Sequence, residues 1–107
     1  MSQPTYTTVT IANGATAASA YETKGAERGS FQLPAAMTGT TITINVSNDA
    51  ATWTACPIEG NEINPITSTA ASKTYSLPTK AFNFRYIQLV SGSAEAAARS
   101  ILICTRD

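Results

Sequence analysis

Residues that could carry out chemistry are few in this chain, and one residue type is missing altogether. The 107 residues include no histidine. Because histidine is the commonest general base and the commonest metal ligand, Ser-His-Asp and Cys-His arrangements are excluded. The only two cysteines, Cys56 and Cys104, lack the paired spacing of a zinc site. We therefore expect no catalytic residue, no cofactor and no metal ion.

Two acidic groups remain as candidates. Glu59 and Glu62 are close enough in sequence to suggest the paired carboxylates of glycoside hydrolysis. They fall in an irregular segment of a chain too small to surround a sugar ring, so we interpret them as solvated loop residues. Calcium could use Asn45, Asn48 and Asp49, but one carboxylate at a turn is weak support.

Cysteine and aromatic side chains have structural interpretations. We read Cys56 and Cys104 as small buried hydrophobes, and their pairing in a disulfide stays open because it depends on the distance between their Cβ atoms. Trp53 is the single tryptophan, and we expect it in the core rather than as a sugar-stacking platform. Arg85 is expected on the solvent face, with Glu95 or Glu62 as the alternative partners of a buried ion pair.

A partner interface is predicted in the first quarter of the chain, where the hydrophobic pattern is weak. Tyr6 and Tyr21 are the large side chains of that region, and a core position is the alternative for both. Amphipathic aromatic residues are enriched at protein interfaces. The residues predicted to contact a partner are Gln3, Pro4, Tyr6, Tyr21, Lys24 and Arg28.

The elements that position these residues follow a period of two, which is typical of β-strands. The clearest segment is 40–47, where Ile42, Ile44 and Val46 alternate with polar residues. Such a pattern indicates an antiparallel sheet with one face toward solvent. Asn48 to Ala51 is predicted to turn the chain back into a hairpin partner. Further strands are expected over 6–11, 28–33, 52–56, 73–77, 82–91 and 99–105. The segment 94–98 could form a helical turn, but it is too short to be stable alone.

About eight short strands with Gly, Pro and Asn turns are typical of a sandwich or barrel. The predicted fold is all-β: a single antiparallel β-sandwich, jelly-roll-like, that covers residues 1–107 as one domain. A short N-terminal arm is expected over about residues 1–7.

Composition narrows the class of partner. Charged residues make up 13% of the chain, against ~25% in ordinary domains, and seven Lys and Arg balance seven Asp and Glu. Scattered positive residues without a basic stripe argue against a nucleic-acid partner.

The first residues do not resemble a secretory leader, and no apolar stretch approaches the length of a membrane span. We expect synthesis in the cytoplasm and no membrane partner.

Two stretches carry a resemblance. Ile42 to Trp53 reads Ile-Thr-Ile-Asn-Val-Ser-Asn-Asp-Ala-Ala-Thr-Trp, and 84–92 reads Phe-Arg-Tyr-Ile-Gln-Leu-Val-Ser-Gly. Together with Arg99-Ser-Ile-Leu-Ile103 and the opening segment 9–14, they resemble a family of tailed-phage virion proteins with a jelly-roll-like sandwich. The resemblance implies a capsid decoration (cement) protein, located on the virion, that binds the major capsid protein as a dimer or trimer. It carries over no binding residue.

A second resemblance is to discoidin-like jelly rolls, which bind sugars or lipid surfaces. They share the Ser-x-Asp-Gly-x-x-Trp hairpin and the later Arg-Tyr-Ile strand, but here Ala50 replaces the glycine and Gln88 replaces a second arginine. Alternatives to decoration are therefore a fibre, tail or adaptor subunit of a phage, or a carbohydrate-binding module. An enzyme is not expected.

Overall fold

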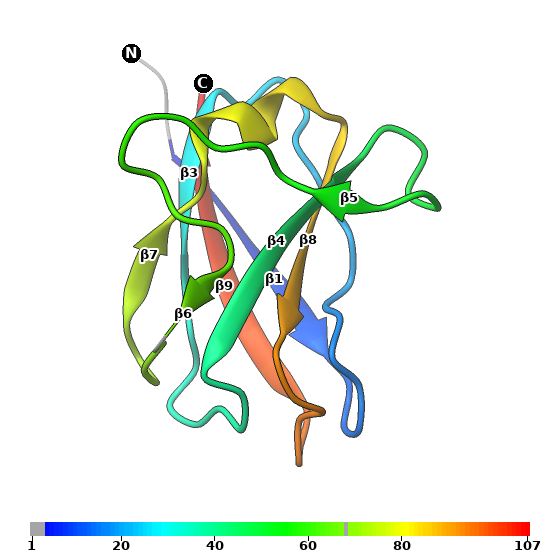
Figure 1. Cartoon of the computed structure of the whole chain (residues 1–107), viewed down its shortest axis with the longest axis vertical. Helices are drawn as coiled ribbons and strands as arrows, with labels where there is room; N and C mark the ends of the chain where they lie inside the picture. The colour runs from blue at the N-terminus through cyan, green and yellow to red at the C-terminus, as the bar shows by residue number, and fades with distance from the viewer. Residues whose placement is uncertain (1–3, 68) are drawn as a thin grey trace.

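Two antiparallel sheets pack face to face in the computed structural model, which describes residues 4–67 and 69–107 (Figure 1). Sheet A has the strand order β1 (Thr5–Ile11), β9 (Arg99–Arg106), β3 (Arg28–Gln32) and β7 (Thr74–Ser76). Sheet B has the order β2 (Tyr21–Glu22), β8 (Tyr86–Ser91), β4 (Thr41–Ser47) and β5 (Thr54–Ala55), and β6 (Ile66–Thr67) also pairs with β4. The predicted all-β sandwich is confirmed.

Strand pairing is nested along the chain. β1 pairs with β9, β2 with β8, β3 with β7, and β4 with both β5 and β6. This is one long hairpin rolled across two sheets, which is the jelly-roll arrangement. β9 also pairs with β3, and β8 with β4, so the rolled hairpin closes into two sheets. The jelly-roll topology expected from the sequence is therefore present.

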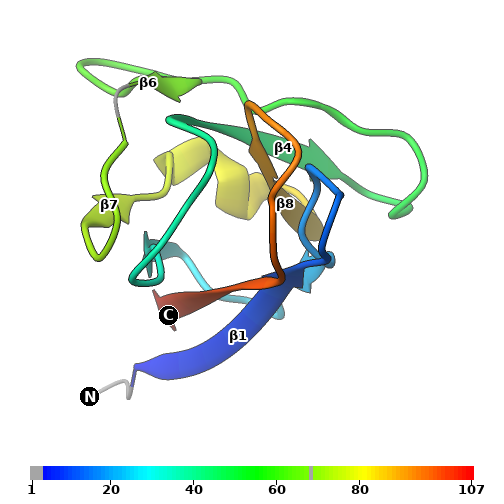
Figure 2. The same cartoon turned by 90° about the horizontal axis from the view of Figure 1, so that it is seen from below.

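The core lies between the sheets and is built from alternating aliphatic residues. Figure 2 shows the layer with β4 and β8 lying over the layer with β1 and β9. Ile42, Ile44 and Val46 of β4 are buried, as the alternation predicts, and so are Ile101 and Ile103 of β9. Burying each such side chain contributes roughly 1.5–3 kcal/mol, so these two layers hold the sandwich together.

Local boundaries differ from those predicted. Strand β8 starts only at Tyr86, because Pro78 begins the 3-10 helix η1 (Thr79–Asn83), whose Ala81 packs into the core. The segment 94–98, which is too short for a stable helix, forms none, and strands β2 and β6 were not predicted. Of the expected arm, residues 5–7 are paired in β1, and residues 1–3 lie outside the described residues.

Glu95 explains why 94–98 is not helical. Its side chain turns inward, is 1% exposed, and accepts hydrogen bonds from the backbone N–H groups of Thr38 and Gly39 at 2.8 and 2.9 Å. Ser91 Oγ and Arg99 Nε donate to the same carboxylate. Burial alone would raise the pKa of Glu95, but these hydrogen bonds outweigh it and hold the pKa at about 2.

The predicted turn after β4 is confirmed, but its tryptophan lies elsewhere than expected. Asp49 Oδ1 accepts hydrogen bonds from Ser47 Oγ and from the backbone N–H groups of Ala51 and Thr52. Trp53, which follows this turn, is half-buried and does not belong to the core cluster. Its expected core position is therefore wrong, because it immediately precedes β5, an edge strand whose two residues are both exposed.

Helical structure is minor. In the part of the chain that the structure describes, no helix has the length and apolar character that crossing a bilayer requires.

Candidate partner-binding surface

The outer side of sheet A is a solvent-facing surface with few charges. Alternate residues of its four strands point outward, as their register and burial show. We call this surface the sheet A face; its residues are Tyr6, Thr8, Thr10, Arg28, Ser30, Gln32, Thr74, Ser76, Ser100, Leu102, Cys104 and Arg106.

An apolar centre lies where β1 meets β9. Tyr6 is 63% exposed and lies directly opposite Cys104, while Leu102 is 38% exposed and lies opposite Thr8. Two of the four exposed large hydrophobic side chains of the described residues therefore share this face. Exposed aromatic and apolar side chains set among polar ones are typical of a protein interface.

Two arginines lie together at one end of the same face. The register of β3 and β9 places Arg28 directly opposite Arg106, and both are exposed. None of the outward positions of these four described strands carries an acidic residue. This end of the face therefore carries two positive side chains on neighbouring strands.

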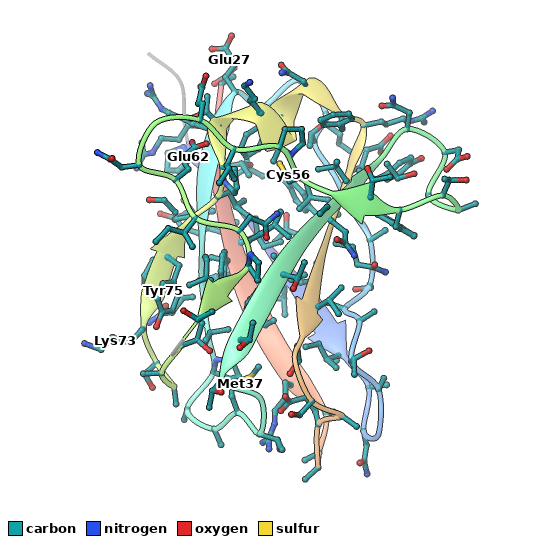
Figure 3. All side chains as sticks on the ribbon, in the orientation of Figure 1. Glu27, Met37, Cys56, Glu62, Lys73 and Tyr75 are labelled. Carbon is teal, nitrogen blue, oxygen red and sulfur yellow. The ribbon has the colours of Figure 1, made fainter. Side chains whose placement is uncertain are left out.

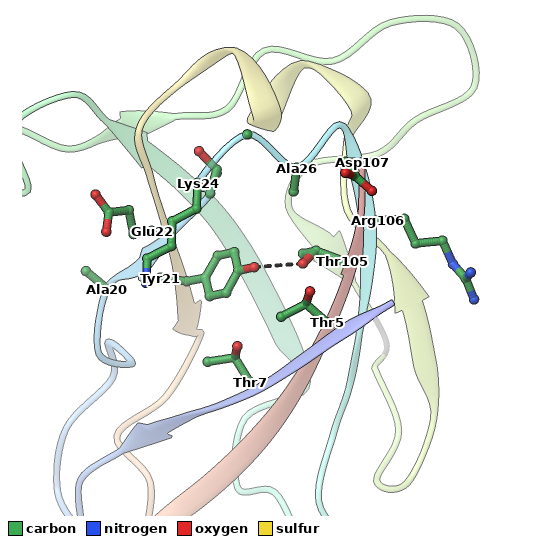
Figure 4. Close-up of a pocket in the computed structure, with 12 residues that line it drawn as sticks. Thr5, Thr7, Ala20, Tyr21, Glu22, Lys24, Ala26, Thr105, Arg106 and Asp107 are labelled. Atoms are coloured by element: carbon green, nitrogen blue, oxygen red, sulfur yellow. Dashed lines mark hydrogen bonds between the residues drawn. The ribbon is translucent and has the colours of Figure 1, made fainter. Parts of the chain in front are cut away.

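A groove of about 570 Å³ adjoins this face, between the edge strands β1 and β2 (Figure 4). The two edges meet at the bridge between Ile11 and Ala18 and part toward Thr5 and Thr23. The inward positions of β1 change along the strand from Ile11 and Val9 to Thr7 and Thr5. Hydroxyl groups thus replace aliphatic ones where the core opens to solvent.

Tyr21 forms the floor of the groove. Its phenol oxygen and Thr105 Oγ1 share a hydrogen bond of 2.8 Å, and the two residues are 7% and 2% exposed. Lys24 stands at the rim, where Lys24 and Gly25 both have positive φ angles and the Ala26 N–H donates to the Thr23 carbonyl. Positive φ angles at both central residues of a turn favour glycine, and this turn carries the chain from β2 in sheet B to β3 in sheet A.

The predicted interface residues divide between these two places. Tyr6 and Arg28 lie on the sheet A face, and Pro4 immediately precedes β1 and is half-buried. Lys24 is exposed at the groove rim. Tyr21, which was expected to face a partner, belongs to the core, because its ring lies between Thr7 and Thr105. Gln3 lies outside the described residues.

Most residues of the face were not predicted to contact a partner. Leu102 and Cys104 lie in the predicted strand 99–105, and its alternation with the buried Ile101 and Ile103 would have placed them outward. The expectation that Cys104 is buried is therefore wrong. Arg106 lies one residue beyond the predicted strand. What the sequence could not show is that β9 lies between β1 and β3, which joins Tyr6 and Arg28 across it.

Side chains outside this surface have structural roles. Glu62 does not pair with Glu59 as an acid and base would, because its carboxylate accepts the N–H groups of Glu59 and Thr79. These hydrogen bonds lower the pKa of Glu62. Cys56 and Cys104 are both free thiols, and burial raises the pKa of Cys56 to about 11 (Figure 3). Within the described residues, no cluster of potential metal ligands exists.

Arg85 was expected either on the solvent face or in an ion pair with Glu95 or Glu62. Its side chain is 62% exposed, which confirms the solvent face, and Nε donates to Glu22 at 3.0 Å. The carboxylate partner is thus neither Glu95 nor Glu62. The guanidinium also lies 5.2 Å from the centroid of the Tyr86 ring.

No protein-family model matches the chain, and no curated protein sequence does. Among solved structures, the SPBc2 prophage-derived protein YomS is similar, with a TM-score of 0.63 and 8% sequence identity. The likeness covers 98% of this chain and 96% of that chain. At this identity it establishes a shared fold over almost the whole of both chains.

Proposed function

We propose that this chain is a non-enzymatic structural protein of a phage virion, and that it decorates the capsid by binding its outer surface through the sheet A face. The observation that carries the proposal is that face itself. It combines an apolar centre at Tyr6 and Leu102 with the adjacent arginines Arg28 and Arg106. Exposed Tyr and Arg side chains of this kind are enriched at protein interfaces.

Two further observations support the phage assignment. A prophage-derived protein has the same fold over nearly its full length. The hairpin 42–53 and the strand 84–92 resemble corresponding segments of tailed-phage virion proteins, and both segments prove to be paired neighbours, since β4 and β8 lie side by side.

The proposed stabilisation of the capsid requires binding alone and no catalytic step. A protein that binds the assembled shell, and not its dissociated subunits, stabilises the shell by mass action. An interface of roughly 800 Å² per partner is enough for specific binding. Repeated over many sites on a capsid, a modest gain at each site becomes a large resistance to disassembly.

Binding of purified protein to undecorated particles tests the proposed surface. Tyr6→Ser removes the exposed ring, and we expect binding to weaken about tenfold or more, as for an interface aromatic anchor. Ile63→Ser is the matched control, because Ile63 is equally exposed at 63% but lies in the loop between β5 and β6. Equal binding by the two variants would show that the sheet A face is not the contact surface.

A further inference from the structure

β1 is a long edge strand without the usual protection. It contains seven residues, whereas the other strands at sheet edges, β2, β5, β6 and β7, contain two or three. Proteins protect long edges with charged residues, proline or bulges. β1 has no charged residue and no proline, and its register with β9 is continuous from Thr5 to Ile11.

The backbone groups that face the open edge can be identified from Thr10. Its N–H donates to Ser19 Oγ and its carbonyl accepts a hydrogen bond from the Ser19 N–H, so both groups point away from β9. Alternate residues of a strand point their backbone groups the same way. The N–H and C=O groups of Tyr6 and Thr8 therefore also point outward. Among the described residues, none of these four groups has a hydrogen-bond partner.

The part of β1 whose outward backbone groups can still pair with another strand is centred on one residue. Thr10 ends it on one side, because Ser19 occupies its groups. Pro4 ends it on the other, because proline has no N–H. Tyr6 and Thr8 are the hydrogen-bonding residues that remain, and Thr7 lies midway between them.

We propose that β1 pairs with β1 of a second copy of this chain, antiparallel, with the two-fold axis at Thr7. Tyr6 then exchanges two hydrogen bonds with Thr8 of the partner subunit, and Thr8 exchanges two with Tyr6 of the partner subunit. All four open groups on each chain are satisfied. Sheet A continues through the axis into a single eight-stranded sheet.

Charge and space favour a second copy over an unrelated strand. The edge is neutral, so self-pairing brings no like charges together, and its Thr, Tyr and Val residues are good strand formers. An added strand lies 4.7–4.9 Å from β1, on the groove side. The groove of about 570 Å³ provides the space for the inward side chains of that strand. This pairing does not depend on the proposed capsid role.

Disulfide trapping of the full chain tests the axis. Thr7 faces Thr7 of the partner subunit as a non-hydrogen-bonded pair, whose Cα atoms lie at ~4.5 Å, within the range that a disulfide bridges. Thr7→Cys, made in a Cys104→Ser background, is expected to form a covalent dimer under mild oxidation. The remaining Cys56 is buried and does not compete.

Thr5→Cys in the same background is the control. It lies on the same face of β1, but it is expected to meet Val9 of the partner subunit, so it forms no disulfide across the axis. Equal cross-linking of both variants would overturn the register. Sedimentation that finds the unmodified chain monomeric at all accessible concentrations would overturn the pairing itself.

Thr8→Pro gives an independent test, because it removes one outward N–H per chain without touching the ladder to β9. The two lost hydrogen bonds should raise the dimer dissociation constant about tenfold or more, whereas Thr8→Val, which keeps the N–H, should leave it unchanged. A dimer that Thr8→Pro leaves as tight as before contradicts pairing through this edge, provided circular dichroism shows the fold retained.

Discussion

Glu95 is the residue on which one end of the sandwich depends. Its carboxylate joins the loop at Thr38 and Gly39 to Ser91 and to Arg99 on β9. Its backbone groups also join it to the loop at Gly14 and Ala15. A buried carboxylate with four donors is stable only while it is ionised and bonded. This arrangement leads to a stability prediction and a pH prediction.

Glu95→Gln is expected to lower the free energy of unfolding by about 2–3 kcal/mol, because it removes the charge that Arg99 and the two backbone donors bind. Chemical denaturation measures the loss. Glu22→Gln is the control, since its pair with the 62% exposed Arg85 should contribute less than about 1 kcal/mol. Similar losses in the two variants would contradict the special role of Glu95.

The pH dependence follows from the lowered pKa of Glu95. Its folded pKa of about 2 lies below the ordinary value of 4.5, so its contribution is complete above pH 4.5 and is lost as the pH falls toward 2. Unfolding measured between pH 6 and 2 should therefore show a steeper loss in the natural chain than in Glu95→Gln. Parallel curves would be inconsistent with this assignment.

Ala50 holds a left-handed backbone conformation, with φ of +61°, at the position where the resembling hairpins have glycine. A Cβ atom in this region is unfavourable, whereas glycine adopts it freely. Ala50→Gly should therefore stabilise the protein by about 0.5–1 kcal/mol. Thermal unfolding checks this, and the neighbouring Ala51→Gly, expected to be neutral or destabilising, is the control.

At the scale of elements, the strands with strict alternation could be predicted, and those fixed by distant contacts could not. β4 and β9 follow from Ile42 to Val46 and from Ile101 to Ile103 alone. β2 pairs over two residues only, so no local pattern marks it. The segment 82–91 was predicted as one strand, but its first residues belong to the 3-10 helix that follows Pro78 and buries Ala81.

The side chain of Asn64 anchors the loop between β5 and β6 to β4. Asn64 Oδ1 accepts the Ile44 N–H at 2.9 Å, and Nδ2 donates to the carbonyls of Ile44 and Cys56 at 2.9 and 3.0 Å. Asn64→Ala leaves the Ile44 N–H and the Cys56 carbonyl without this partner, while the Ile44 carbonyl still accepts the Cys56 N–H, and should destabilise the protein by about 2 kcal/mol in chemical denaturation. Asn61→Ala, at the exposed tip of the same loop, should change stability by less than about 0.5 kcal/mol.

At the scale of the molecule, the two thiols report which surface is free. Cys56 is buried with a pKa raised to about 11, whereas Cys104 is partly exposed beside Tyr6 on the sheet A face. A thiol reagent at pH 8 should label Cys104 first in the free protein. On particles, Cys104 should be protected if the sheet A face is the contact surface. Undiminished labelling on particles would place the contact elsewhere.

Only part of the sheet A face could be predicted from the sequence. Tyr6 and Arg28 were predicted as partner residues from a weak hydrophobic pattern, and both are exposed on one face. Tyr21 came from the same pattern and is buried, because the direction of a side chain depends on which sheet its strand joins. The face as a whole exists only through β9, which returns from the end of the chain to lie between β1 and β3.

The copy number of this chain in purified particles, relative to the major capsid protein, tests the central claim most directly. Quantitative mass spectrometry of particles gives the ratio. A decoration protein is expected at one copy per capsid subunit or at a simple fraction of that number. A few copies per particle, as a tail, fibre or adaptor subunit would have, or none at all, would contradict the decoration role.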